Sequence, residues 1–233
     1  MKDIHEIRQV AVMRSAFKQK YGIPRQPRLV QGLKSEIVFG DEFNNPEAVR
    51  GLEEFSHIWL IWEFSDTKID MTEEHPAWKP TVRPPRLGGD IRKGVFATRS
   101  PYRPNSLGMS AVKLLEIRDD NGQLSLIVEG ADLLDGTPIY DIKPYIPYSD
   151  IIADADEGFA KSIDTSIDVE FPDDLLAKVD EEFRAPLIRI LELDPRDAYD
   201  RDSVKPCKMA FANVDIEFVL RDGRLVVTAV NEL

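Results

Sequence analysis

The 233-residue chain has little cysteine, little histidine and no long apolar stretch. Cys207 is the only cysteine, which excludes an internal disulfide and a zinc site built from cysteines. The histidines (His5, His57 and His75) are too scattered to suggest a metal site. The longest apolar run, Ile58–Trp62, is far short of the ~20 residues that span a bilayer, and the charged N-terminus is unlike a secretory signal. We therefore expect a cytoplasmic protein with no metal and no membrane association.

The glycine-rich loops of the common nucleotide-binding folds are also absent. The chain contains no G-x-G-x-x-G motif, no P-loop and no G-x-S-x-G nucleophile motif. A Rossmann-type methyl-donor enzyme is expected to open with a strand and a glycine-rich turn, and this chain does not. The Rossmann fold is therefore excluded.

Charge is distributed unevenly along the chain. The formal net charge is −12, yet residues 79–113 carry eight bases against one acid, and residues 9–34 carry six bases and no acid. An acidic protein would ordinarily repel nucleic acid, but these two stretches could form one positive face on an acidic body. The alternative is that the same bases are scattered over a solvated surface.

The first 150 residues are typical of a mainly β protein. The residues at 57–64 are nearly all apolar, which favours a strand buried on both faces. A short helix is predicted after Asn45, with Asn45 as its N-cap and Pro46 in its first turn. Strands are predicted at five places, residues 7–13, 57–64, 95–98, 110–117 and 124–129. Stiff, proline-rich loops are predicted at residues 24–27, 76–89, 101–104 and 138–147.

Beyond an acidic turn at residues 154–158 the composition changes. A helix is predicted from Pro172, and Pro186 is expected to break it and to start a second helix that ends near Leu193. Alternating apolar residues at 214–220, a turn at Asp222-Gly223 and a return strand at 225–230 predict a β-hairpin. This part of the chain is expected to be a small α+β subdomain.

Three polar segments with restricted backbones remain, residues 24–28, 81–110 and 133–147. Their arginines and backbone donors suit a nucleotide or phosphate ligand. Alternatively, they are tight structural turns of a barrel.

The segments resemble the TsaA-like/TrmO family, with supporting similarity at residues 50–59 and 194–199. The resemblance covers nearly the whole chain. It implies an N-terminal TsaA-like β-barrel, residues 1–155, that binds cofactor and catalyses, followed by the α+β subdomain, residues 156–233.

The resemblance also implies a function. Members of this family are S-adenosylmethionine-dependent methyltransferases that act as homodimers. Their bacterial substrate is tRNA with N6-threonylcarbamoyladenosine at position 37, which they methylate on N6. The matching motifs imply cofactor contacts from Gln26, Pro27, Arg28, Asp66, Thr67, Arg99, Leu107, Met109, Asp132, Leu133, Leu134 and Asp135.

The chemistry of that reaction suggests further candidates. A carbamoylated N6 is a poor nucleophile because its lone pair is delocalised, so a protein group must help to remove its proton. Asp135, Tyr140 and Asp141 are candidates for this role, and Lys143 or Arg103 could stabilise charge on the carbonyl oxygen. Arg83, Arg86 and Arg103 are expected to bind tRNA. Two other functions stay open: a nonenzymatic S-adenosylmethionine-binding regulator, and a methyltransferase for another RNA or a small molecule.

Overall fold

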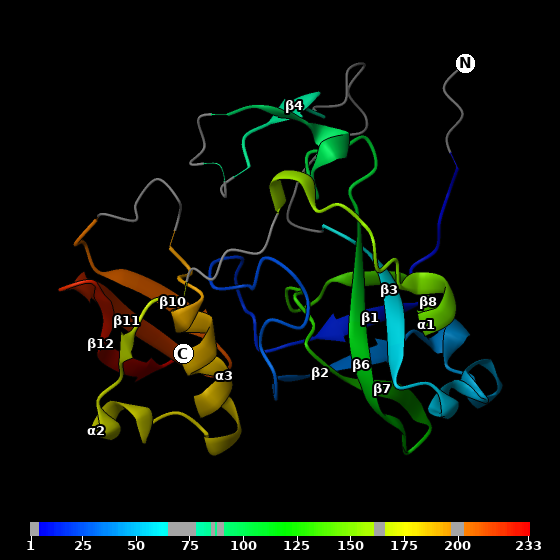
Figure 1. The fold of residues 1–233 in the computed structure, drawn as a ribbon. Coiled ribbons are helices and arrows are strands. Elements are labelled where there is room, and N and C mark those ends of the chain that lie inside the picture. Colours follow the sequence, from blue (N-terminus) through cyan, green and yellow to red (C-terminus); the bar gives the residue numbers. More distant parts are fainter. Residues whose placement is uncertain (1–4, 65–77, 85–86, 88–90, 161–165, 197–202) are drawn as a thin grey trace.

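The protein is mainly β in the computed structural model, as the sequence predicts (Figure 1). The structure describes residues 5–64, 78–84, 87, 91–160, 166–196 and 203–233. Twelve strands lie in this part of the chain: β1 (Ala11–Arg14), β2 (Lys34–Phe39), β3 (His57–Glu63), β4 (Thr81–Val82), β5 (Lys93–Gly94), β6 (Leu107–Asp120), β7 (Gln123–Glu129), β8 (Pro138–Pro144), β9 (Val169–Glu170), β10 (Cys207–Phe211), β11 (Val214–Arg221) and β12 (Arg224–Glu232).

Six strands form a sheet in the order β1-β2-β7-β6-β3-β8, and the sheet closes because β1 also pairs with β8. Ile58, Leu60 and Trp62 of β3 point into the closed sheet, while the residues between them are partly exposed. The prediction that β3 is buried on both faces is therefore wrong. In a closed antiparallel sheet only one face is interior, so side chains alternate between core and surface.

Two further predictions of local structure are corrected. Residues 138–147 are not simply a loop, because β8 runs between Pro138 and Pro144, with the prolines at its two ends. Residues 95–98 are not a strand but form a 3₁₀ turn, η5 (Val95–Ala97), in which the Thr98 hydroxyl donates to the Val95 carbonyl over 2.8 Å. Only Val95 of this turn is buried, so the turn needs a single apolar anchor rather than a strand's alternation.

The helices are short. Asn45 is an N-cap as predicted, since its side chain accepts from the Glu47 N–H over 3.0 Å. Among the described residues, no helix is long and apolar enough to cross a membrane. The α-helices are α1 (Pro147–Asp150), α2 (Asp173–Leu176) and α3 (Glu181–Glu192); the 3₁₀ turns besides η5 are η1 (Asp41–Phe43), η2 (Pro46–Val49), η3 (Leu52–Glu54) and η6 (Gly158–Ala160).

A second sheet has the order β10-β11-β12-β9. Its β11–β12 hairpin turns at Asp222-Gly223, where both residues have positive φ, and it confirms the predicted hairpin. Pro186 does not separate two helices, however: it lies inside α3, and the break falls earlier, between Leu176 and Glu181. Pro186 lacks one helical N–H but is buried with the apolar side of α3, and that packing outweighs the lost hydrogen bond.

The segment between β1 and β2 joins the two sheets. Phe17 forms a bridge to Phe211 of β10, and their rings meet edge to face 5.8 Å apart. The core of the second sheet consequently includes N-terminal residues (Ala16, Phe17, Val30 and Leu33). In Figure 1 this blue segment lies between the two sheets. Its packing on both sides holds residues 20–28 beside the open end of the closed sheet.

Candidate cofactor pocket and active site

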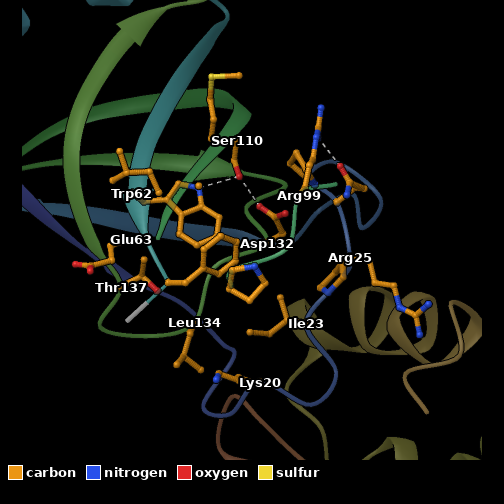
Figure 2. Close-up of a pocket in the computed structure, with 18 of the residues that line it drawn as sticks. Lys20, Ile23, Arg25, Trp62, Glu63, Arg99, Ser110, Asp132, Leu134 and Thr137 are labelled. Atoms are coloured by element: carbon orange, nitrogen blue, oxygen red, sulfur yellow. Dashed lines mark hydrogen bonds between the residues drawn. The ribbon is translucent and has the colours of Figure 1, made fainter. Parts of the chain in front are cut away.

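A cavity of about 760 Å³ opens where the ends of β3 and β6 meet three loops (Figure 2). This volume is typical of a pocket for a nucleotide-sized ligand. The loops are those that the sequence singled out as polar and proline-stiffened. The lining residues are Lys20, Ile23, Pro24, Arg25, Gln26, Pro27, Ile61, Trp62, Glu63, Phe64, Thr98, Arg99, Pro101, Tyr102, Arg103, Leu107, Gly108, Met109, Ser110, Asp132, Leu134 and Thr137.

Backbone contacts position the loop at residues 24–28 against the loop that follows β7. The Arg28 N–H donates to the Gly130 carbonyl over 2.8 Å. Gly130 has φ +84°, and a Cβ there would lie 3.1 Å from the Arg28 Cα, so a glycine lets the two loops approach. On the cavity side, Arg99 donates to the Gln26 side-chain oxygen over 2.5 Å. This bond links the loop at residues 24–28 to the loop between η5 and β6. Three segments far apart in sequence therefore share one wall.

A hydrogen-bonded chain of three side chains crosses the floor of the cavity (Figure 2). The Trp62 indole N–H donates to the Ser110 hydroxyl over 3.1 Å, and that hydroxyl donates to the Asp132 carboxylate over 2.7 Å. Trp62 and Ser110 are buried, and they come from neighbouring strands β3 and β6. Gly108 pairs with Trp62 across these strands, and a Cβ on Gly108 would overlap the indole ring. The chain fixes both the indole plane and the carboxylate.

Burial raises the pKa of Asp132 to about 6, against an ordinary value of 3.8. The Ser110 hydrogen bond, the backbone N–H of Asp132 itself and the nearby positive charge of Arg99 oppose this shift without cancelling it. A carboxylate in this setting gains from a cationic ligand group, because such a group replaces the water that burial removed. Perturbed carboxyls of this kind cluster in functional sites.

A second carboxylate, Glu63 at the end of β3, also lines the cavity. The Tyr140 hydroxyl of the adjacent strand β8 donates a hydrogen bond to it. Burial, followed by the Glu63 hydrogen bond and charge, raises the pKa of Tyr140 to about 12. Tyr140 is therefore a protonated hydrogen-bond donor at neutral pH, and it holds the Glu63 carboxylate in place.

Comparison with known proteins identifies the family. A family model described as the tRNA-methyltransferase O N-terminal domain matches residues 12–151, more than half of the chain. The chain belongs to the TrmO family. A relative in Escherichia coli (strain K12), tRNA (adenine(37)-N6)-methyltransferase, is 40% identical over 204 residues, 83% of each chain. The putative S-adenosylmethionine-dependent methyltransferase RcsF of Pseudomonas aeruginosa is 45% identical over 177 residues, 76% of this chain and 70% of that protein.

The similarity extends to the solved structures of the TrmO family. A crystal structure of TrmO from Pseudomonas aeruginosa matches with a TM-score of 0.77 at 30% sequence identity, covering 98% of this chain and 99% of that chain. The match therefore includes both sheets. The family assignment made from the motifs of the sequence is confirmed.

Most of the residues that the TrmO family motifs assign to the cofactor line the cavity. These are Gln26, Pro27, Arg99, Leu107, Met109, Asp132 and Leu134. Arg28 and Leu133 do not line it: Arg28 anchors the loop through its backbone, and Leu133 is buried in the core of the closed sheet. Asp66 and Thr67 lie outside the described residues.

The residues predicted to be catalytic are more dispersed. Asp135 does not line the cavity; its carboxylate accepts from the Ser15 N–H over 3.0 Å and pairs with Lys18 over 3.1 Å. Asp141 and Lys143 pair with each other over 3.0 Å on β8, also outside the cavity lining. Tyr140 reaches the cavity only through Glu63.

Of the residues predicted to bind tRNA, Arg103 lines the cavity and Arg83 is exposed just after β4. Arg86 lies outside the described residues. Sequence reasoning missed Trp62, Glu63 and Ser110. Trp62 and Glu63 lie at the end of β3 and Ser110 lies inside β6, and none of these positions has a local mark of a functional role. One available signal is that a polar residue, Glu63, ends the apolar run of β3. Within the described part of the chain, no three potential metal ligands cluster.

Proposed function

We propose that this protein methylates N6 of adenosine 37 in tRNA, with S-adenosylmethionine as the methyl donor. The observation that carries the proposal is the 40% identity to the Escherichia coli tRNA (adenine(37)-N6)-methyltransferase over 83% of both chains. The cavity supports it, because the family's motif segments converge there.

The residues of the cavity fit S-adenosylmethionine. This donor carries a cationic sulfonium, an ammonium, a carboxylate and a nucleoside, and its sulfonium supplies an electrophilic methyl group. Asp132 offers a buried carboxylate to a cationic group, and Arg99 offers a guanidinium to an anionic one. The indole of Trp62 and the ring of Tyr102 add aromatic surface, which attracts a sulfonium or a purine ring.

We propose that the substrate adenosine carries the N6-threonylcarbamoyl group, as the family resemblance implies. Its N6 needs a proton acceptor, and Glu63 is the carboxylate that the structure connects to a predicted catalytic residue, Tyr140. In this assignment Glu63 takes the N6 proton while Tyr140 fixes its orientation. Asp135, Asp141 and Lys143 would act from outside the cavity, so we give them second place.

The tRNA is proposed to approach over the basic segment 79–113, with contacts from Arg83, Arg86 and Arg103. Local positive charge must overcome the repulsion between tRNA and a body of net charge −12, so affinity is expected to fall steeply with salt.

We also propose a cytoplasmic homodimer, with residues 1–155 as the cofactor-binding and catalytic unit and residues 156–233 as a supporting α+β unit. Light scattering tests the dimer, and a mass near 26.5 kDa at micromolar concentration contradicts it.

Calorimetry and a methyl-transfer assay test the central proposal. The wild-type protein is expected to bind S-adenosylmethionine in the presence of EDTA. Arg99→Ala should weaken this binding about tenfold or more, because Arg99 lines the cavity and the donor would lose a charged hydrogen bond from its guanidinium. Arg221→Ala, in the distant β11–β12 hairpin, is the matched control and should bind normally.

The same preparation is then incubated with tRNA that carries or lacks the threonylcarbamoyl group. Mass spectrometry of the nucleosides should show a methyl group added only to the modified adenosine. Methylation of both tRNAs contradicts the proposed substrate. If the protein binds the donor but transfers no methyl group to either tRNA, the proposal of an enzyme is wrong and the nonenzymatic S-adenosylmethionine-binding regulator is favoured.

A further inference from the structure

Three exposed or partly exposed aromatic side chains lie on neighbouring segments next to the cavity, which Tyr102 also lines. Phe96 of η5 is 74% exposed, and Trp78 and Tyr102 are 37% and 43% exposed. The rings of Trp78 and Phe96 are nearly parallel, with 27° between their planes and 6.5 Å between their centroids. Each ring left in water forgoes about 2 kcal/mol or more of the free energy that its burial would provide. Exposed rings of this kind suggest that a ligand or partner covers them. We call Trp78, Phe96 and Tyr102 the aromatic platform.

Backbone hydrogen bonds hold the platform in shape. The Lys79 N–H donates to the Tyr102 carbonyl over 3.0 Å, and the Val95 N–H donates to the Pro80 carbonyl over 3.0 Å. Pairing of β4 with β5 closes the same unit, with Thr81 opposite Gly94. Figure 1 shows that this two-stranded sheet lies apart from the closed sheet and from the second sheet. The aromatic rings are therefore presented on a preorganised scaffold, so ordering them on binding costs little entropy.

The segments that carry the aromatic platform also carry positive charge. The Lys79 ammonium lies 4.5 Å from the centre of the Tyr102 ring. Arg92, which directly precedes β5 and donates to the Thr81 hydroxyl over 3.0 Å, is exposed. Aromatic rings interleaved with lysine and arginine form the surface that single-stranded nucleic acid binds, with bases on the rings and phosphates on the cations. A protein partner of ordinary composition does not call for this density of positive charge.

The aromatic platform is continuous with the cavity. Tyr102 belongs to both, and Thr98, two residues after Phe96, also lines the cavity. A nucleotide whose base enters the cavity would therefore bring the neighbouring nucleotides of its strand onto the platform.

We infer that the aromatic platform stacks unpaired bases of the anticodon loop that adjoin the methylated adenosine. This inference rests on the proposed function and adds to it the part of the RNA that the enzyme recognises. Unpaired loop bases present free π-faces, whereas paired bases in a stem do not. The platform thus makes the enzyme select a loop rather than a duplex, independently of base identity.

Fluorescence anisotropy with two labelled RNAs tests the inference, one a hairpin with an unpaired loop and the other a fully paired duplex of the same length. Phe96→Ala should weaken binding of the loop RNA by about 5-fold to 150-fold, the range expected for one lost base stack. Phe96→Trp should keep the wild-type affinity, because the stacking surface is retained. The control is Tyr148→Ala, which removes another exposed ring, 92% exposed on α1, and should change nothing.

Salt dependence separates stacking from charge. Phe96→Ala should leave the slope of log affinity against log salt unchanged, while Arg92→Ala should reduce the magnitude of that slope by roughly 0.7. Wild-type affinity of Phe96→Ala for the loop RNA overturns the inference, and so does an equal loss for the duplex. A change in oligomeric mass of Phe96→Ala overturns it too, since the platform would then be an interface between copies. If the wild-type protein methylates tRNA and Phe96→Ala binds it normally, the inference fails while the proposed function stands.

Discussion

Asp132→Asn isolates the energetic cost of the buried carboxyl in the cavity. The substitution removes the charge and keeps an oxygen that accepts the hydrogen bond from the Ser110 hydroxyl, which lies 2.7 Å away. Its shape is nearly that of the original side chain. The change therefore tests charge rather than packing.

The size of the effect follows from the pKa of Asp132, raised mainly by burial from 3.8 to about 6. Such a shift opposes ionisation in the folded protein by about 3 kcal/mol. Because the folded pKa lies above the unfolded value, the stabilising contribution is complete below pH 3.8 and is lost as the pH rises through about 6. The wild-type protein should lose about 3 kcal/mol of stability through this group, and Asp132→Asn should not.

Urea unfolding followed by fluorescence, repeated from about pH 4 to about pH 8, measures this difference. Relative to the wild type, the free energy of unfolding of Asp132→Asn should rise across this range by about 2.5 kcal/mol, most of it before pH 7, because a small part of the full effect is already present at pH 4. A pH-independent difference in the free energy of unfolding between the two proteins reflects the replacement of a carboxyl by an amide, and it does not test the prediction. A difference that stays constant with pH refutes the claim that burial of Asp132 perturbs its ionisation.

Three further substitutions test other parts of the structure. Gly108→Ala should push the Trp62 indole into the cavity, which costs about 1–3 kcal/mol of stability by urea unfolding and weakens binding of the methyl donor by calorimetry. Tyr140→Phe, which leaves Glu63 without its phenol partner, should lower kcat about tenfold while calorimetry finds donor affinity unchanged; equal kcat values contradict the assignment. Phe17→Ala empties a fully buried site in the second core and should cost about 3–5 kcal/mol; a loss below about 1 kcal/mol contradicts the role of this residue in joining the two sheets.

Local sequence patterns were sufficient for structure that depends on neighbouring residues. The hairpin at residues 214–230 follows from the apolar residues that alternate at 214–220 and from Asp222-Gly223, a turn pair that accepts positive φ. The Asn45 cap follows from an amide that can accept from the backbone two residues on. Both features are determined within a few residues, so no knowledge of the fold was needed.

Tertiary packing decided the cases in which the local pattern failed. Pro186 has the local character of a helix breaker, yet α3 continues through it because the apolar side of the helix is buried in the second core. The apolar run of β3 suggested burial on both faces, and closure of the sheet left one face partly exposed. In each case the energy of burying side chains against distant segments exceeded the local preference.

The same division holds for the candidate site. By itself the sequence determined the family and the loops of the pocket, since Gln26, Arg99 and Asp132 all lie in motifs that can be read along the chain. Only the tertiary structure decided which functional groups meet: Ser110 reaches Asp132 because β6 and the loop after β7 adjoin, and Tyr140 reaches Glu63 because β8 pairs with β3. These pairs are 22 and 77 residues apart. A hydrogen bond depends on distance and direction in space, and strand pairing sets both without leaving a mark in the sequence around either partner.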